Sequence, residues 1–222
     1  MNPNIKKSDT LYQKIYNYLK IKILRNEIQA GEIVNETQLS QYFETSRSPV
    51  RDAIKMLESE GYLIQAGSSK IVSKFNWDDI NDLIEIRKSL ELMVYDLAIK
   101  KIEPKDLKKL NDLIEEMKKV KSNDNYSLIN IDTEFHKYFA KITKNKLLIN
   151  LMSSVYDQLI RASMISILRF DWNKDVNIKY HTDILECLKS EKYDKGREEL
   201  VNHVNIWTNA INEVKNKVET DL

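Results

Sequence analysis

The sequence predicts a mainly α-helical chain of two domains: three helices with a small β-hairpin, followed by an all-helical bundle of six to seven helices. Apolar residues recur at helical spacing along most of the chain. Only 4 glycines and 3 prolines occur in 222 residues, so the connections between helices are expected to be short. Strand-type residues around a turn occur at residues 62–73, and no strand-like alternation follows residue 76. We therefore expect domains at residues 1–75 and 76–222.

Bulk composition excludes several classes of protein. Hydrophobic residues make up 42% of the chain, which is enough for a packed core. No apolar run approaches the roughly 20 residues of a membrane span, and the polar start MNPNIKKSDT is unlike a signal peptide. Cys187 is the single cysteine, so no disulfide can form within the chain. These features predict a cytoplasmic protein without membrane contact.

Charge is distributed unevenly between the two expected domains. The net charge is +1, but residues 1–75 carry 11 Lys and Arg against 8 Asp and Glu, whereas residues 76–222 carry 24 against 26. Only 7 of the 35 basic residues are arginines, and Arg47 and Arg51 lie close together in the first domain. Because most basic residues of the chain are lysines, two arginines at these positions indicate that the planar, bidentate guanidinium is needed there.

The stretch NETQLSQYFETSRSPVRDAIKMLESEG, residues 35–61, predicts two short helices joined at residues 44–46. Ser46 is a good N-cap for the second helix, and Pro49 falls in its first turn, where a missing N–H costs nothing. A further helix is expected at residues 9–26, before this pair. Apolar residues at helical spacing give each helix one apolar face: Leu39, Tyr42 and Phe43 in the first helix, and Val50, Ile54 and Leu57 in the second.

Residues 46–63, SRSPVRDAIKMLESEGYL, resemble the signature of the GntR family of bacterial transcription regulators, which runs S-R-x-P-V-R-x-A-L-x-x-L-x-x-x-G. Residues 9–74 align along that family's winged helix-turn-helix domain. The resemblance implies a DNA-binding protein whose second helix of the pair is the recognition helix and whose hairpin is the wing. The wing departs from the family pattern, because Gly67 stands there without the usual second glycine.

Six residues are expected to contact DNA. Arg47 and Arg51 are four apart on one helix face, and each can reach guanine O6 and N7 in the major groove, a contact worth ~1–3 kcal/mol of discrimination. Phosphate contacts that fix the register are expected from Thr37, Ser46, Ser48 and the Gly67 amide. Some relatives of the GntR family read a further base with an arginine at the position of Thr37, and this chain lacks that arginine. For Arg51 alone, ordinary surface charge is the alternative.

From residue 76 onward the pattern predicts amphipathic helices at about 77–101, 104–121, 125–141, 145–169, 175–190 and 193–217. Pro104 is placed to open the second of these, and Asp124 to cap the third. A bundle of this size after a GntR-type domain resembles the FCD branch of the family. The resemblance implies a domain that binds an effector and supplies most of the dimer contact.

All three histidines lie in the second domain, on helix faces that otherwise carry apolar side chains. Asp132 and His136 are four apart on one expected helix, while His181 and His203 lie on the last two. A buried carboxylate or imidazole without a partner costs several kcal/mol. If these helices face one cavity, a divalent metal would satisfy all four groups. For any single histidine, a satisfied core residue is the alternative.

The FCD resemblance implies the same site, since members of that branch commonly hold a metal through D-x-x-x-H on one helix and two histidines on the last two helices. Asp132, His136, His181 and His203 fall at those positions. Three imidazoles and one carboxylate suit zinc or nickel better than magnesium or calcium.

A fourth protein ligand, with no obvious general base beside it, favours an anchor for a small carboxylate effector over a catalytic centre. Arg87 lies on an inward stripe and can pair with that carboxylate, and Arg161 is a second candidate. An ion pair between Arg87 and Glu91 is an equally good account of Arg87.

These features together predict a ligand-responsive transcription regulator, with a repressor favoured over an activator, that binds a palindromic double-stranded DNA operator as a homodimer. The chain is not expected to be an enzyme. Two alternatives remain: a regulator for which the metal itself is the signal, and a metalloenzyme with a DNA-binding head.

Overall fold

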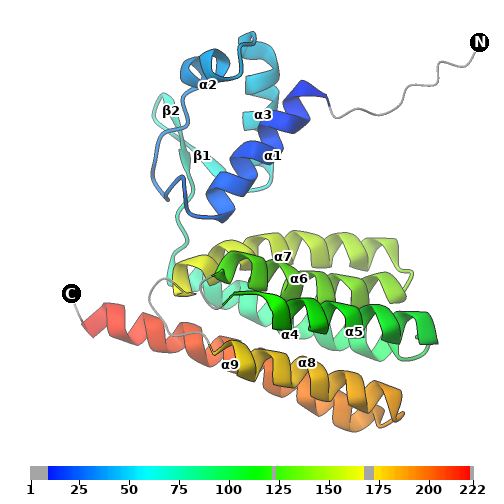
Figure 1. Ribbon diagram of the computed structural model, residues 1–222. Coiled ribbons are helices and arrows are strands. Elements are labelled where there is room, and N and C mark those ends of the chain that lie inside the picture. Colours follow the sequence, from blue (N-terminus) through cyan, green and yellow to red (C-terminus); the bar gives the residue numbers. More distant parts are fainter. Residues whose placement is uncertain (1–9, 122–123, 168–172, 221–222) are drawn as a thin grey trace, which may run out of the picture. The chain divides into compact units, whose positions relative to one another are not determined.

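The structure, a computed structural model, describes residues 10–121, 124–167 and 173–220. These residues form nine helices and one two-stranded antiparallel sheet (Figure 1), so the predicted mainly α fold is confirmed. The chain divides into two compact units, residues 1–75 and 76–222. Within the described ranges, no helix combines the length and the hydropathy needed to cross a bilayer.

The N-terminal unit contains α1 (Leu11–Leu24), α2 (Glu36–Tyr42) and α3 (Arg47–Ser59). Both α1 and α2 pack on α3, as expected of a helix-turn-helix with a supporting helix. Ser46 is the N-cap residue of α3, as expected, although its side chain makes no capping hydrogen bond. The core is made of apolar side chains that are at most 1% exposed: Ile15, Leu19, Val50, Ala53, Ile54, Leu57, Tyr62, Leu63 and Val72.

The end of α3 explains the glycine of the signature. Gly61 has a positive φ of 76°, which a side chain with a Cβ adopts only at a cost. The Tyr62 N–H donates to the Leu57 carbonyl at 2.8 Å, and the Gly61 N–H donates to the Glu58 carbonyl at 3.0 Å. These two bonds form a Schellman motif, which turns the chain sharply from the recognition helix into the first strand.

The hairpin consists of β1 (Leu63–Ala66) and β2 (Ser69–Val72), paired antiparallel from Leu63↔Val72 to Ala66↔Ser69. Gly67 begins the two-residue turn with a φ of 58°. The Gln65 side chain braces this turn, since its Nε2 donates to the Gly67 carbonyl at 2.6 Å. One glycine therefore suffices for the hairpin, although the family pattern has two.

The second unit contains the other six described helices: α4 (Trp77–Ala98), α5 (Pro104–Lys119), α6 (Asn125–Ile142), α7 (Lys146–Ile167), α8 (Lys174–Lys189) and α9 (Tyr193–Thr220). Pro104 is the first residue of α5, and Asp124 caps α6 by accepting a hydrogen bond from the Ser127 N–H, both as expected. The predicted end of the fourth bundle helix, at residue 169, lies outside the described residues.

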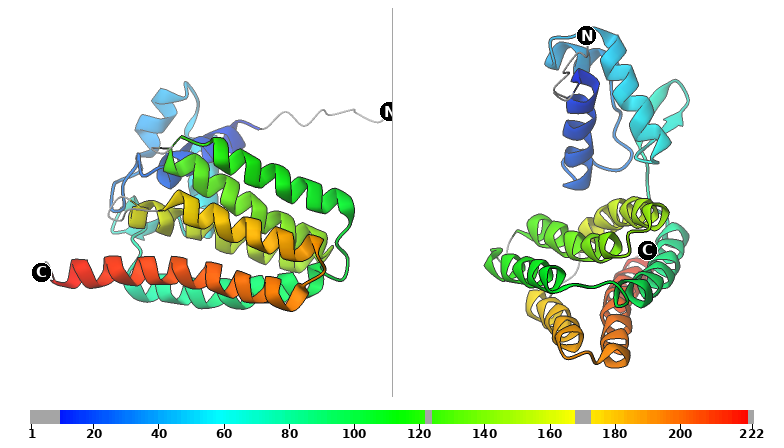
Figure 2. Two further views of the ribbon diagram at one scale, coloured as in Figure 1. Left: turned by 60° about the horizontal axis from the view of Figure 1, so that its bottom comes forward. Right: turned by 90° about the vertical axis from the view of Figure 1, so that its right-hand side faces the viewer.

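The six helices form a closed ring of neighbours, which the view along the bundle in Figure 2 shows. Around the ring α5 packs on α6, α6 on α7, α7 on α4, α4 on α9, α9 on α8, and α8 on α5. Each helix therefore turns one face toward a shared interior. The largest side chains buried there are aromatic: Tyr95, Phe135 and Tyr156.

Candidate functional site

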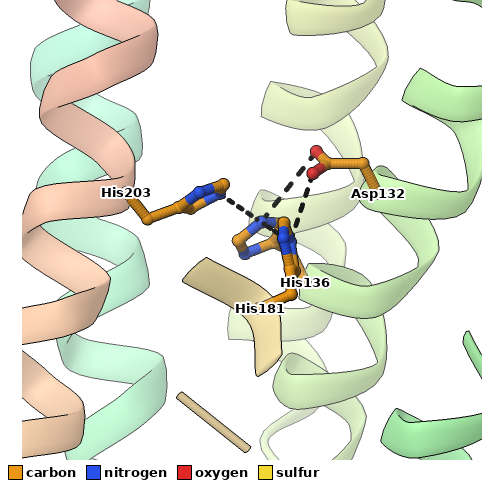
Figure 3. Close-up of side chains that lie close together, drawn as sticks. All are labelled: Asp132, His136, His181 and His203. Carbon is orange, nitrogen blue, oxygen red and sulfur yellow. Dashed lines mark hydrogen bonds and ion pairs between the residues drawn. The ribbon is translucent and has the colours of Figure 1, made fainter. Parts of the chain in front are cut away.

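Four ligand-type side chains meet inside the bundle. Asp132 and His136 come from α6, His181 comes from α8 and His203 comes from α9, and their polar groups point toward one another (Figure 3). One potential ligand atom from each residue lies within 4.8 Å of all the others. We call these four residues the Asp–His cluster. Its three imidazoles are at most 4% exposed, so they are shielded from water.

The imidazole Nε2 atoms are very close together. His136 Nε2 lies 3.1 Å from His203 Nε2 and 3.3 Å from His181 Nε2. His181 Nε2 also lies 3.1 Å from Asp132 Oδ1, and His136 Nε2 lies 4.0 Å from Asp132 Oδ2. Two nitrogens that share a zinc ion at 2.0–2.1 Å, at angles between square and tetrahedral, lie about 2.8–3.4 Å apart. The spacing in the cluster therefore fits a common ion.

Neighbouring groups determine which imidazole nitrogens carry protons. His181 Nδ1 lies 2.8 Å from the Asn177 carbonyl, and His136 Nδ1 lies 3.1 Å from Glu91 Oε2. Both partners accept only, so each favours a proton on the Nδ1 atom that faces it. Arg87 Nη2, which only donates, lies 3.4 Å from His203 Nε2, so this nitrogen is an acceptor. Asp132 Oδ1, which only accepts, faces His181 Nε2 and favours a proton there when no metal is bound. The three Nε2 atoms converge beside this carboxylate, and a divalent cation that displaces that proton would be held by all four groups.

The electrostatics of the cluster favour a neutral His203 and an ionised Asp132. Burial lowers the pKa of His203 well below its usual range, and the charges of His181 and His136 lower it further. Burial alone would raise the pKa of Asp132, but its hydrogen bond with His181 and the nearby imidazoles hold that pKa well below the ordinary value. Neutral imidazoles and an ionised carboxylate are the forms that bind metals. The donor set thus fits zinc or nickel.

A second layer of polar side chains lies behind the cluster. Glu91 on α4 is 2% exposed and accepts hydrogen bonds from Arg87 Nε at 2.5 Å and from the Tyr156 hydroxyl on α7. Burial would raise the pKa of Glu91, but Arg87 and His136 outweigh it, and the pKa lies well below its usual range. Arg87 therefore has the ion pair with Glu91 that the sequence offered as an alternative, and it also lies at the edge of the cluster.

Arg161 is buried on α7, and its Nη1 donates to Gln158 Oε1 of the same helix at 3.0 Å. This hydrogen bond joins two residues of one helix and does not involve the Asp–His cluster.

Sequence reasoning missed three residues that contact the cluster or support it. Glu91 was weighed only as a partner of Arg87, and Asn177 and Tyr156 were not considered. The Asn177 side-chain amide donates to Asp132 Oδ1 at 2.9 Å while its carbonyl holds His181. The spacing of four between Asn177 and His181 was a usable signal, because such residues share a helix face. Tyr156 gave no such signal, since its partners lie on other helices.

The expected DNA-contacting residues lie on the surface of the N-terminal unit. Arg51 Nη2 lies 3.3 Å from Glu36 Oε2, which places the second turn of α3 beside the first turn of α2. The Arg51 side chain remains 54% exposed, and an exposed pair of this kind holds it only weakly. The structure therefore brings together the start of α3 and the start of α2. Exposed candidates are Thr37, Ser46, Arg47, Ser48 and Arg51, and on the turn Gly67.

Two family models match the chain. Residues 11–69 match the gntR family of bacterial regulatory proteins, and residues 82–205, more than half of the chain, match the FCD domain. The matched stretches contain the helix-turn-helix and the Asp–His cluster, respectively.

Relatives and solved structures agree with these matches. The chain is 28% identical over 197 residues to an uncharacterized HTH-type transcriptional regulator of Bacillus subtilis, YdhC, covering 87% of this chain and 88% of that protein. It is 28% identical over 152 residues to the gluconate operon transcriptional repressor of the same organism, covering 66% and 62%. Its fold is similar to that of Escherichia coli McbR/YncC, with a TM-score of 0.80 and 19% identity, covering 94% of this chain and 100% of that one.

These relatives are transcriptional regulators and not enzymes, so the expectation of a DNA-binding regulator is confirmed. The chain belongs to the GntR family of bacterial transcriptional regulators, in the branch that carries an FCD domain after the DNA-binding domain.

Proposed function

We propose that this regulator binds a palindromic operator as a homodimer and responds to a small carboxylate effector at a divalent metal, zinc or nickel, held by the Asp–His cluster. The observation that carries the proposal is the convergence of three imidazole Nε2 atoms and one carboxylate in a buried interior. When bound, the metal would supply a positive charge able to hold a carboxylate oxygen.

The buried charges support an anionic effector. Asp132 and Glu91 each contribute one negative charge, and Arg87 contributes one positive charge, while the three imidazoles are neutral in the metal-binding form. This set has a net charge of about −1, which a divalent cation changes to about +1. One carboxylate then makes the buried site neutral, and a buried net charge is costly. Arg87, beside His203, is the side chain best placed to pair with that carboxylate, and Arg161, buried on α7, is a second candidate.

The cavity beside the cluster is too small for an effector, so effector binding must rearrange the surrounding side chains. A cavity next to His136 has a volume of about 10 Å³ and is lined mostly by apolar side chains, among them Val94, Phe139 and Met152. A volume of this size accommodates about one water molecule. An effector larger than that must displace side chains of the helices that line the cavity, which are α4, α6, α7, α8 and α9. Such a displacement gives the bound and free proteins different interior packing, which regulation requires.

Exposed apolar side chains support the homodimer. Ile86 and Met93 on α4 are 47% and 52% exposed, and Leu147 and Leu151 on α7 are 70% and 47% exposed. The two helices are neighbours in the bundle ring. Exposed apolar side chains gathered on adjacent helices are typical of an interface, and a second copy of the chain is the occupant that a palindromic operator calls for.

Replacing Met93 with glutamate is expected to dissociate the dimer, because the substitution places a charge where the partner would exclude water. A central interface residue contributes about 2 kcal/mol or more, so the dissociation constant should rise at least about 30-fold. Sedimentation velocity over a dilution series measures this. Lys88→Glu, which also adds negative charge at an exposed position of α4, is the matched control and should leave the dimer intact. Unchanged sedimentation of the Met93 variant would place the interface elsewhere.

The DNA-binding roles follow from the exposed residues of the N-terminal unit. We assign Arg47 and Arg51 to guanine edges in the major groove, and the phosphate contacts to Thr37, Ser46, Ser48 and the Gly67 amide. The name of one relative, the gluconate operon transcriptional repressor, supports a repressor and a sugar acid as the first effector to test.

Operator affinity measured with and without gluconate, in zinc-loaded protein at fixed salt, tests the proposed response. Typical couplings of about 1–3 kcal/mol predict a 5- to 150-fold change in affinity for the correct acid. Other sugar acids and small hydroxy acids form the rest of the panel. If chelation alone abolishes operator binding and no acid alters it, the metal is itself the signal and the effector proposal is wrong.

A further inference from the structure

Glu91 makes a contact that neither the family signature nor the proposed function uses. Its Oε2 atom lies 3.1 Å from Nδ1 of the cluster residue His136. This distance is short enough for a hydrogen bond, but the two groups are not aligned as one. No donor among the described residues makes a hydrogen bond to this oxygen, which is fully buried. A buried carboxylate oxygen without a donor is costly, so a proton on His136 Nδ1, the ring nitrogen that faces it, stabilises the pair.

Three helices meet at this one carboxylate. Glu91 belongs to α4, His136 to α6 and Tyr156 to α7. The other oxygen, Oε1, accepts from Arg87 Nε at 2.5 Å and from the Tyr156 hydroxyl, so two donors fix the position of the carboxylate. Arg87 and Glu91 are only 3% and 2% exposed, and water does not compete for these bonds. These two hydrogen bonds therefore fix the orientation in which the carboxylate faces the imidazole.

We infer that Glu91 is a positioning residue for the metal site: it keeps the proton of His136 on Nδ1 and thereby presents the Nε2 lone pair to the metal. This inference rests on the proposed metal site. A carboxylate has acceptors only, so the ring nitrogen that faces it must be the protonated one. Partners of this kind orient a metal-binding histidine and raise its basicity.

His181 also has an acceptor beside its Nδ1 atom, but there the acceptor is a main-chain carbonyl. His181 Nδ1 donates to the main-chain carbonyl of Asn177, one turn earlier on α8. A side-chain substitution leaves that carbonyl in place. Glu91 supplies the same function from a different helix through a side chain, and it can therefore be tested.

Glu91→Gln is the direct test. The glutamine keeps the shape and an acceptor oxygen for Arg87 and Tyr156, but it turns an NH₂ group toward His136 Nδ1. The ring must then accept at Nδ1 and carry its proton on Nε2, which cannot bind a metal in that form. Zinc affinity, measured by competition with a chromophoric chelator, is expected to fall 10- to 100-fold, the usual effect of losing such a partner. Glu85→Gln, at an exposed position of the same helix, is the matched control and should keep wild-type affinity.

A second measurement needs no variant. Long-range ¹⁵N–¹H correlation spectra of the full chain with labelled histidine report which nitrogen of each ring is protonated. The wild-type protein should show His136 protonated on Nδ1 in both metal-free and zinc-loaded samples, and the Gln variant should show Nε2 protonated when metal-free.

The outcomes separate the inference from the proposal beneath it. Wild-type protein that binds zinc, together with a Gln variant of equal affinity and an unchanged His136 tautomer, would overturn the role of Glu91 alone. Wild-type His136 protonated on Nε2 would overturn it as well. Failure of the wild-type chain to bind zinc would overturn the metal site and the inference with it.

Discussion

Replacing Arg47 and Arg51 together with alanine is expected to weaken operator binding by about 30-fold to 10⁴-fold. Each guanidinium can pair with a guanine, a contact worth about 1–3 kcal/mol, and the loss of two positive charges also lowers the affinity for phosphate. Arg51 is 54% exposed and its ion pair with Glu36 lies on the surface, so the fold should tolerate the change. Fluorescence anisotropy on an operator obtained by in vitro selection, compared with scrambled DNA at one salt concentration, measures the effect.

Lys55→Ala is the matched control for this double variant, since Lys55 is an exposed cation on the same helix. It should reduce binding to operator and scrambled DNA about equally, whereas the arginine variant should lose its preference for the operator. Equal thermal stability of the variants would show that folding is intact. An arginine variant that retains operator affinity within a few-fold would contradict the recognition-helix assignment.

Replacing His181 with glutamine is expected to abolish the stabilisation of the protein by zinc. His181 is fully buried, and its Nε2 contacts both His136 and Asp132, so its loss leaves the metal with an incomplete ligand set. A metal at 1,000 times its dissociation constant stabilises the native state by about 4 kcal/mol. For a chain of this length that corresponds to a shift in Tm of ~8–16 °C.

Thermal unfolding with zinc and with excess chelator measures this difference. Wild-type protein should show the shift, and the His181 variant should unfold at about the same temperature in both conditions. Thr182→Ala, which alters the neighbouring position on α8, should keep the zinc-dependent shift. A His181 variant whose unfolding temperature rises with zinc as much as that of the wild type would show that the metal binds elsewhere.

The sequence predicted the helices well because their beginnings are encoded locally. Pro104 can stand at the first position of a helix without losing a hydrogen bond, and Asp124 caps the next helix through its own side chain. Helix ends were less accurate: the first bundle helix was expected to continue to residue 101 and ends at Ala98. The residues 99–103 before Pro104 carry no glycine or other distinct stop signal, which explains the error.

The cluster could be predicted for a similar reason. Asp132 and His136 share a helix face, and three histidines on apolar faces are rare enough to indicate one common partner. The second layer could not be predicted in the same way. Glu91 and His136 are 45 positions apart, and Tyr156 reaches Glu91 from a third helix. Only the packing of α4, α6 and α7 determines that these groups meet, and helical periodicity does not specify which helices become neighbours.

A crystal grown with zinc, with diffraction measured on both sides of the zinc absorption edge, tests the metal site most directly. We predict an anomalous peak between the Nε2 atoms of His136, His181 and His203 and the carboxylate of Asp132, at about 2.0–2.2 Å from each ligand atom. A zinc peak at any other position, or electron density that leaves the four side chains joined only to one another, would contradict this account.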